Sequence, residues 1–553
     1  MPIWTRSARR SFATPEQPVA NLVRRPAPPR AVALLLVFSV AAGCGGGGGG
    51  SRAAGPLDFD LRVGITDPGT LDPARANGRA AFLVLKQICD PLVAFDQATG
   101  ELKPGLAESW TVSDDGKTFR FQLRSGVKFH NGRELVAEDF VFSLMRLADP
   151  RTQSPHHYLL EKVAGYSNVR AGINPLLVGV RGGDPRVLEI ELSEPHLEFP
   201  ALMAHPAAGS PVAREELEGS PEKYGKSPTC TGAYRVESND TPTGPLQITR
   251  FDDYYGANGA YSRGGRGYAK RIVFNVKPSL EDSYELLEED EVDVATISSG
   301  DLGRARQEAG RVESGQSGHV SYIGFPVTRP PFDNLDVRRK MAGSINRRSI
   351  VNDLLGGSRA EAKGFLPRSS GPVAQQADCP EPEGGGDAQA PSDLLLYLNS
   401  GGGHEAWLQS VADDWERDLK SRTTLRTMDW NEYVDFLAGQ GADGPFRMSW
   451  SVGVPSPEAM LNPLFTTGSP NNFSRYSSSE FDGLLNKARA MVDDEERAKT
   501  YAEAAKVLCK DQPILPIWFG LNHVAFGPNV SSVVKSRLDL FGDPILRELR
   551  FTG

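Results

Sequence analysis

Hydrophobic and polar residues alternate in four short stretches, which is typical of half-buried β-strands. These stretches predict strands at 59–65, 119–123, 188–192 and 272–276. Apolar residues at helical spacing predict helices at 138–147, 283–289, 337–355 and 405–419, and two more within 480–509. Residues 256–267 and 369–390 are rich in glycine and proline, which predicts loops. Because strands and helices mix along the chain without an internal repeat, the fold class is α/β or α+β with several lobes.

A short apolar run at 31–40 follows a basic N-terminal segment. Residues 1–43 hold six arginines and one acidic residue, Glu16. Removing these charges from the totals of 61 Lys+Arg and 70 Asp+Glu leaves 55 basic and 69 acidic residues in the body. The run is too short for a bilayer core, which needs about 20 residues. It therefore predicts a cleaved export signal rather than a retained membrane helix.

Cys44 follows the small residues Ala41, Ala42 and Gly43, and six glycines come after it. Small residues before a cysteine resemble the lipobox of bacterial lipoproteins, where the cysteine is acylated after cleavage. A plain secretory signal with an incidental cysteine is the alternative. We expect a lipoprotein signal peptide at 1–43 and an acylated Cys44 with a glycine-rich tether at 44–57. The protein is then anchored by lipid to the cell membrane, on its extracytoplasmic side.

Four further cysteines are candidates for disulfides: Cys89, Cys230, Cys379 and Cys509. An even number in an exported protein predicts two bridges, with three possible pairings. Buried free thiols are the alternative. We favour Cys230–Cys379 with Cys89–Cys509, because a bridge from Cys379 would close a long glycine- and proline-rich loop.

Composition and motifs exclude several classes of protein. Hydrophobic content of 39% with 24% charged residues is ordinary for a soluble globular chain, and 553 residues suggest two to four domains. The pI near 5.6 argues against nucleic-acid binding. His156 and His157 are expected to be surface or turn residues, and no spacing predicts a metal site or cofactor. Since no nucleophile elbow or P-loop occurs, we do not expect an enzyme.

Short motifs follow one another through the body in a recognisable order. They include Thr70-Leu71-Asp72-Pro73, PGLAESW at 104–110, Thr231-Gly232-Ala233-Tyr234 and PPFDN at 330–334. This series resembles the family 5 extracytoplasmic solute-binding proteins, the oligopeptide- and dipeptide-binding components of ABC importers. The resemblance covers about residues 61–526.

The resemblance implies an α/β, two-lobed periplasmic-binding-protein-like fold of type II. Lobe 1 would span 58–320 and contain a small inserted domain at about 90–212. Lobe 2 would span 321–522, and 523–553 would return to lobe 1. Such a protein captures an oligopeptide-like solute between its lobes, as a monomer, and delivers it to permease subunits that work with cytoplasmic ATPases.

The resemblance also implies where a ligand is bound. The main chain of the ligand would be held like an added strand between two strips. Asn77, Gly78 and Arg79 would form the first strip, and Ser449, Trp450 and Ser451 would form the second. Phe142 and Trp430 match aromatic positions that line side-chain pockets, and Arg447 matches a basic position that pairs with a ligand carboxylate. The alternatives are core positions for the tryptophans and a surface ion pair for Arg447.

One departure from the family concerns the amino end of the ligand. Peptide binders carry an Asp two or three residues after the tryptophan of the second strip, but no acid stands here between Trp450 and Glu458. We therefore expect a preference for ligands with a free carboxylate or polar acceptors and tolerance of a blocked or absent amino terminus, with Arg79 as a second candidate cation. An oligosaccharide or another solute, or a non-transport envelope lipoprotein of the same fold, is the alternative.

Overall fold

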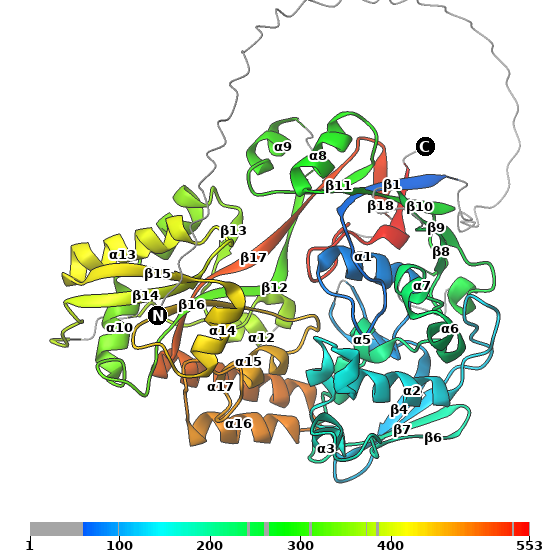
Figure 1. The fold of residues 1–553 in the computed structure, drawn as a ribbon, viewed down its shortest axis with the longest axis horizontal. Coiled ribbons are helices and arrows are strands. Elements are labelled where there is room, and N and C mark those ends of the chain that lie inside the picture. The colour runs from blue at the N-terminus through cyan, green and yellow to red at the C-terminus, as the bar shows by residue number, and fades with distance from the viewer. Residues whose placement is uncertain are drawn as a thin grey trace, which may run out of the picture. The chain divides into compact units, whose positions relative to one another are not determined.

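One mixed β-sheet runs through both lobes of the described chain (Figure 1). The computed structural model describes residues 59–97, 99–239, 244–258, 265–308, 312–371, 373–382, 386–532 and 536–551. In spatial order the strands are β15 (Arg422–Met428), β14 (Asp393–Asn399), β16 (Phe446–Ser451), β12 (Val312–Gly324), β17 (Ile514–Phe526), β11 (Val294–Ile297), β1 (Asp60–Thr66), β10 (Arg271–Lys277), β9 (Leu246–Arg250) and β8 (Tyr234–Ser238). A short strand, β13 (Arg359–Glu361), pairs with β17.

The first lobe is built around β1, which pairs in parallel with β10 and β11. The strands predicted at 59–65 and 272–276 are confirmed. Helix α1 (Arg79–Ile88) packs on the apolar face of β1. Helix α8 (Leu280–Glu288) approaches β1 at Gly64, where a Cβ would lie 2.3 Å from Oγ of Ser283. Helix α9 (Leu302–Glu308) and the pair β18 (Val530–Ser532) and β19 (Leu549–Phe551) complete this lobe.

A smaller antiparallel sheet lies between α1 and β8 in the sequence. Its order is β4 (Ala107–Val112), β5 (Thr118–Leu123), β7 (Val187–Glu191) and β6 (Val180–Asp184), and α2 (Ala137–Ala148) shares its core. The strands predicted at 119–123 and 188–192 and the helix at 138–147 are confirmed. The hairpin β2 (Val93–Phe95) and β3 (Leu102–Pro104) precedes the sheet. Short helices follow or connect its strands, namely α3 (Tyr166–Arg170), α4 (Phe199–Leu202), α5 (Pro206–Gly209), α6 (Arg214–Gly219) and α7 (Pro221–Lys226).

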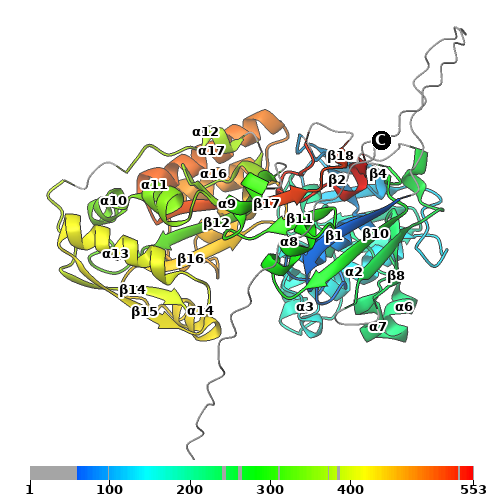
Figure 2. The ribbon, with the colours of Figure 1, turned by 90° about the horizontal axis from the view of Figure 1, so that it is seen from above.

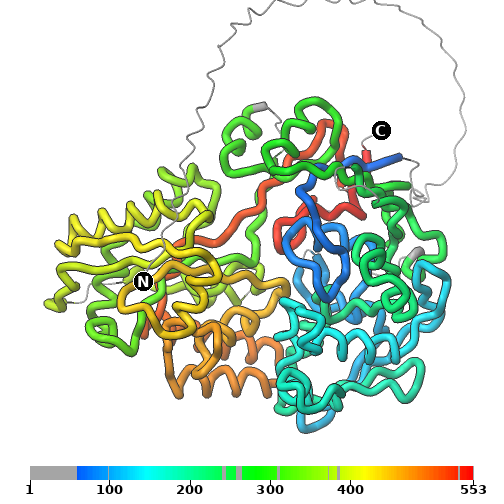
Figure 3. The backbone as a smooth tube through the Cα atoms, viewed as in Figure 1, coloured from blue at the N-terminus to red at the C-terminus, as the bar shows by residue number. Residues whose placement is uncertain are grey.

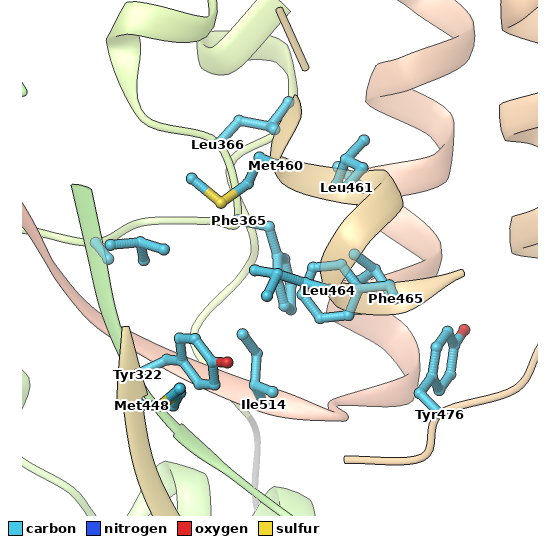
Figure 4. Close-up of a cluster of buried hydrophobic side chains, with 14 of the residues drawn as sticks. Tyr322, Phe365, Leu366, Met448, Met460, Leu461, Leu464, Phe465, Tyr476 and Ile514 are labelled. Atoms are coloured by element: carbon cyan, nitrogen blue, oxygen red, sulfur yellow. The ribbon is translucent and has the colours of Figure 1, made fainter. Parts of the chain in front are cut away.

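The second lobe buries both faces of its part of the large sheet. Helices α10 (Leu335–Gly343) and α13 (Glu405–Leu419) pack on one face. The other face carries α12 (Val373–Gln376), α14 (Trp430–Ala438), α15 (Glu458–Phe465), α16 (Ser479–Arg489) and α17 (Asp494–Asp511). Figure 2 shows α13 and α17 on opposite sides of β12. In the core of Figure 4, the rings of Phe365 and Phe465 meet edge to face at 5.5 Å.

The helix predicted at 337–355 is wrong in part, because the structure breaks it after α10. A three-residue helix, α11 (Arg347–Ser349), and a π-helical turn (Ile350–Leu354) follow. The Asn346 side chain accepts a hydrogen bond from N of Ser349 at 3.0 Å and caps this new turn. The segment 369–390, predicted as a loop, also contains the short helix α12.

Two long strands connect the lobes. Strand β12 pairs with β16 in the second lobe, and β17 pairs with β11 in the first lobe and with β12 along most of its length. Figure 3 shows the two strands side by side, β12 in green and β17 in red. Each strand therefore belongs to the sheet of both lobes.

The four body cysteines form two disulfides, but the favoured pairing is wrong. The bridges are Cys89–Cys230 and Cys379–Cys509, with Cα–Cα distances of 4.9 and 5.4 Å. Gly232 donates a hydrogen bond to the carbonyl of Ile88, which brings Cys230 beside the end of α1. Likewise, α12 packs against α17 and brings Cys379 to Cys509. Each bridge therefore joins segments of one lobe.

Candidate functional site

A cavity of about 420 Å³ brings together residues from both predicted strips. Asn77, Gly78 and Arg79, at the start of α1, line it from the first lobe, and Ser451, at the end of β16, lines it from the second. Strand β12 contributes His319 to the same lining, and Nδ1 of His319 lies 3.0 Å from Oγ of Ser451. Asn77 and Ser451, more than 370 residues apart in the sequence, thus face one space.

The edge of β16 that faces away from β12 has little strand pairing. On that side, β14 pairs with β16 at one position, Tyr397↔Phe446. The main-chain N–H of Val452 donates to the carbonyl of Gly318 in β12. Because the main-chain N–H and C=O groups of successive residues in a strand point to alternate sides, those of Ser449 and Ser451 point away from β12. Within the described residues, this stretch of edge has no partner strand.

Arg79 is engaged within the protein. Its Nε donates to Oδ1 of Asp543 at 2.6 Å, and Nη1 donates to Oγ1 of Thr296 at 3.0 Å. Lys86 also binds Asp543, at 2.7 Å. Burial alone would raise the pKa of Asp543, but the two cations outweigh burial and lower it to about 2. The structure therefore does not support Arg79 as a second cation for a ligand.

Arg447 is a buried cation, 5% exposed, on β16. Its Nη1 donates to Oδ1 of Asn399 at 2.9 Å, and its Nε has no hydrogen-bond partner among the described residues. Burial lowers the pKa of Arg447 to about 10, which leaves it charged at neutral pH. The pKa of His319 is lowered to about 4, by burial and then by the charge of Arg447. Arg447 is not among the residues that line the cavity.

The three predicted aromatic residues lie outside this cavity. Trp450 is half-buried, and its indole N–H donates to the carbonyl of Ala459 at 3.0 Å. Trp430 begins α14 and is 48% exposed. Phe142, on α2, lies under the guanidinium of Arg214 at 5.1 Å. Phe142 lines a separate cavity, of about 470 Å³, together with Arg214, and the pocket-lining roles of Phe142 and Trp430 stay predictions.

The cavity contains an aromatic cluster that sequence reasoning missed. The rings of Phe82, His156 and His205 have centroids 4.8 to 5.4 Å apart. His156 lies in a turn, as predicted, but it is not a surface residue, because it is 9% exposed and its Nε2 lies 2.8 Å from the carbonyl oxygen of Ala76. Burial lowers the pKa of both histidines, so their rings are neutral at pH 7. No spacing in the sequence signalled this cluster, since its members come from three separate segments.

A second cavity, of about 450 Å³, adjoins the first. The two share four residues, namely Tyr158, His205, Val452 and Gly453. A Cβ at Gly453 would lie 2.6 Å from Cδ2 of His205, so no side chain fits there unless the histidine moves. This packing gives a physical reason why position 453 carries no acid.

Two lobes joined by paired strands, with cavities lined from both, define a protein that holds a small solute between its lobes. The model of the bacterial extracellular solute-binding proteins, family 5 middle region, matches residues 101–472. The chain belongs to this family, which confirms the resemblance and the two-lobed α/β fold. It is a solute-binding protein and not an enzyme.

Several known proteins are similar to the chain over most of its length. The probable deoxycholate-binding periplasmic protein YgiS of Escherichia coli K12 is 26% identical, covering 82% of this chain and 86% of its own. The periplasmic oligopeptide-binding protein OppA of Salmonella typhimurium is 26% identical, covering 87% and 93%. The unliganded open form of the murein tripeptide binding protein MppA superimposes with a TM-score of 0.74 at 23% identity, covering 89% and 97%. Within the described residues, every helix is too short or too polar to span a bilayer.

Proposed function

We propose that this chain is the substrate-binding lipoprotein of an ABC importer, which captures an oligopeptide-like solute between its lobes and delivers it to the permease. The observation that carries the proposal is the cavity lined by Asn77, Gly78 and Arg79 from one lobe and by Ser451 from the other. A ligand that touches both strips favours the closed arrangement of the lobes over the open one. The relatives named as oligopeptide- and tripeptide-binding proteins support this ligand class.

The free edge of β16 supports main-chain recognition. An extended peptide that pairs with Ser449 and Ser451 would add a strand to the sheet, as in other cases of β-strand addition. Such pairing does not depend on the side chains of the ligand, so selectivity must come from its ends and from the pockets.

Arg447 is the proposed partner of a ligand carboxylate. Arg447 lines neither cavity, but its buried guanidinium forms no ion pair among the described residues, so a ligand carboxylate that reaches it along β16 would provide the missing countercharge. Of the acids that line the cavities, Asp543 binds Arg79 and Lys86, Glu458 binds Arg489, and Glu161 is exposed at the rim. The preferred ligand therefore has a free carboxylate, and the site tolerates a blocked or absent amino group. The relative named as deoxycholate-binding supports an acidic ligand without an ammonium group.

Cys44 lies outside the described residues, and its acylation is part of the proposal. The apolar run at 31–40, the small residues before Cys44 and the glycines after it support cleavage and lipidation. The protein would act as a monomer on the extracytoplasmic face of the cell membrane, beside its permease.

Calorimetry with a tripeptide in free-amino, N-acetylated and C-amidated forms tests the proposal. We expect acetylation to preserve binding. Arg447→Ala should lower the affinity for the acetylated peptide by roughly 10- to 100-fold. Arg422→Ala is the matched control, since Arg422 pairs with the exposed Asp393 on the same lobe. If acetylation abolishes binding while Arg447→Ala has no effect, the assigned polarity of the site is wrong.

A further inference from the structure

The second cavity continues from the first at the wall that they share. Gly453, three residues after Trp450, and His205 form part of the wall common to both cavities. Beyond them the space continues between Tyr158 and Leu202, on the smaller sheet's domain, and Val454 and Ala459, on the second lobe. The ligand path therefore does not stop at Gly453.

This second cavity is large and predominantly apolar. Most of its lining surface comes from carbon atoms. Its volume of about 450 Å³ is roughly three times that of an engineered apolar cavity, ~150 Å³, that binds benzene. An apolar group of several carbons fits such a space, and its transfer out of water is favourable.

The carboxylates at the second cavity are poorly placed to bind an ammonium group. Glu458 is buried and accepts hydrogen bonds from Nε and Nη2 of Arg489 at 2.9 and 2.6 Å, and from Tyr501 at 3.2 Å. Glu161 is exposed at the rim and accepts a hydrogen bond from Asn462 at 3.0 Å. An exposed carboxylate contributes little to ion pairing, and an ammonium buried without a partner is strongly unfavourable.

We infer that the second cavity binds an apolar, uncharged group carried at the ligand's amino end, so that the natural substrate class is an N-acylated peptide or a similar amphipathic acid. The inference rests on the proposed function, since the rest of the ligand lies in the first cavity. The acyl group occupies the space between Leu202 and Ala459. The carboxylate end extends toward Arg447 along β16.

Affinity for a series of N-acylated tripeptides of one sequence tests this assignment. Each buried methylene contributes a factor of about four, so four added methylenes give at most roughly 200-fold. The conformational entropy that the acyl chain loses on binding offsets part of this gain. We expect the N-hexanoyl peptide to bind at least tenfold tighter than the N-acetyl peptide, and the free-amino peptide to bind no tighter than the acetylated one.

Two variants fill the second cavity from opposite sides, Leu202→Trp and Ala459→Trp. Each should abolish the preference for the hexanoyl peptide over the acetyl peptide. Val492→Trp is the control, because Val492 is 83% exposed and lines neither cavity. The inference is overturned if the hexanoyl peptide shows no gain, if the fillers leave the gain intact, or if the control also removes it.

A further variant, Glu161→Gln, separates an ammonium site from an apolar one. A free-amino peptide that binds best, and weakens on Glu161→Gln, would place an ammonium group at the rim and overturn the inference while the proposed function stands. If no peptide of the series binds at all, the proposed function and this inference both fail.

Discussion

Replacing Arg489 by leucine should lower the free energy of unfolding by about 3–5 kcal/mol. Arg489 and Glu458 form a buried ion pair in which each side chain is 5% exposed. The substitution removes two hydrogen bonds to the carboxylate, each contributing roughly 1.5–3 kcal/mol. It also removes the bonds from Arg489 to Asn462 and Asn486. Glu458 would remain buried with the hydroxyl of Tyr501 as its partner.

Urea denaturation followed by tryptophan fluorescence measures this loss, since buried Trp407 and Trp415 lie in the same lobe. The double variant Glu458→Met with Arg489→Leu is the control. Because it removes both charges, most of the lost stability should return. A loss below about 1 kcal/mol in the single variant would show that Glu458 is not held by Arg489. Glu458 would then be available to a ligand ammonium, which contradicts the argument about the second cavity.

Three further outcomes follow from the described contacts and the sequence. Asp543→Asn should lower the free energy of unfolding by about 2–3 kcal/mol at pH 7, because the lowered pKa of Asp543 means that folding favours its ionised form. This contribution is lost as pH falls from about 4 through the folded pKa of about 2, so a difference in urea midpoint that stays constant over this range would contradict the reasoning. Mass spectrometry of unreduced fragments should find Cys89–Cys230 and Cys379–Cys509, and any cross-linked Cys230–Cys379 peptide would refute this pairing. Opening the second bridge by serine substitution should lower the free energy of unfolding by about 2–5 kcal/mol. Cys44→Ala should leave the protein uncleaved or release it from the membrane fraction, and unchanged membrane association with normal cleavage would count against the lipid anchor.

The spacing of apolar residues predicted many of the strands and helices, because burial of one face of an element leaves a periodic pattern within that element. Alternation in β1, β5, β7 and β10 reflects one buried face, and the predicted helix at 405–419 coincides with α13. The break after α10 was missed because Asn346 starts a new turn, supported by a hydrogen bond from its main chain to Asp414 in a distant helix. Periodicity does not report such a long-range contact.

Only those site residues could be predicted whose position in the chain, relative to the recognised motifs, was enough to place them at the cavity. Asn77, Gly78, Arg79 and Ser451 do come to one cavity. His205 was missed, because its role depends on Gly453 from the other lobe, more than 200 residues away. The disulfide pairing failed for the same reason, since the packing of α12 on α17 decides which cysteines meet.

Small-angle X-ray scattering of the purified protein with an N-acetylated tripeptide mixture tests the central claim most directly. If the ligand touches both lobes and its carboxylate pairs with Arg447, the radius of gyration should fall on adding the acetylated mixture. It should stay constant with the C-amidated mixture. No compaction with either mixture, or equal compaction with both, would contradict the account.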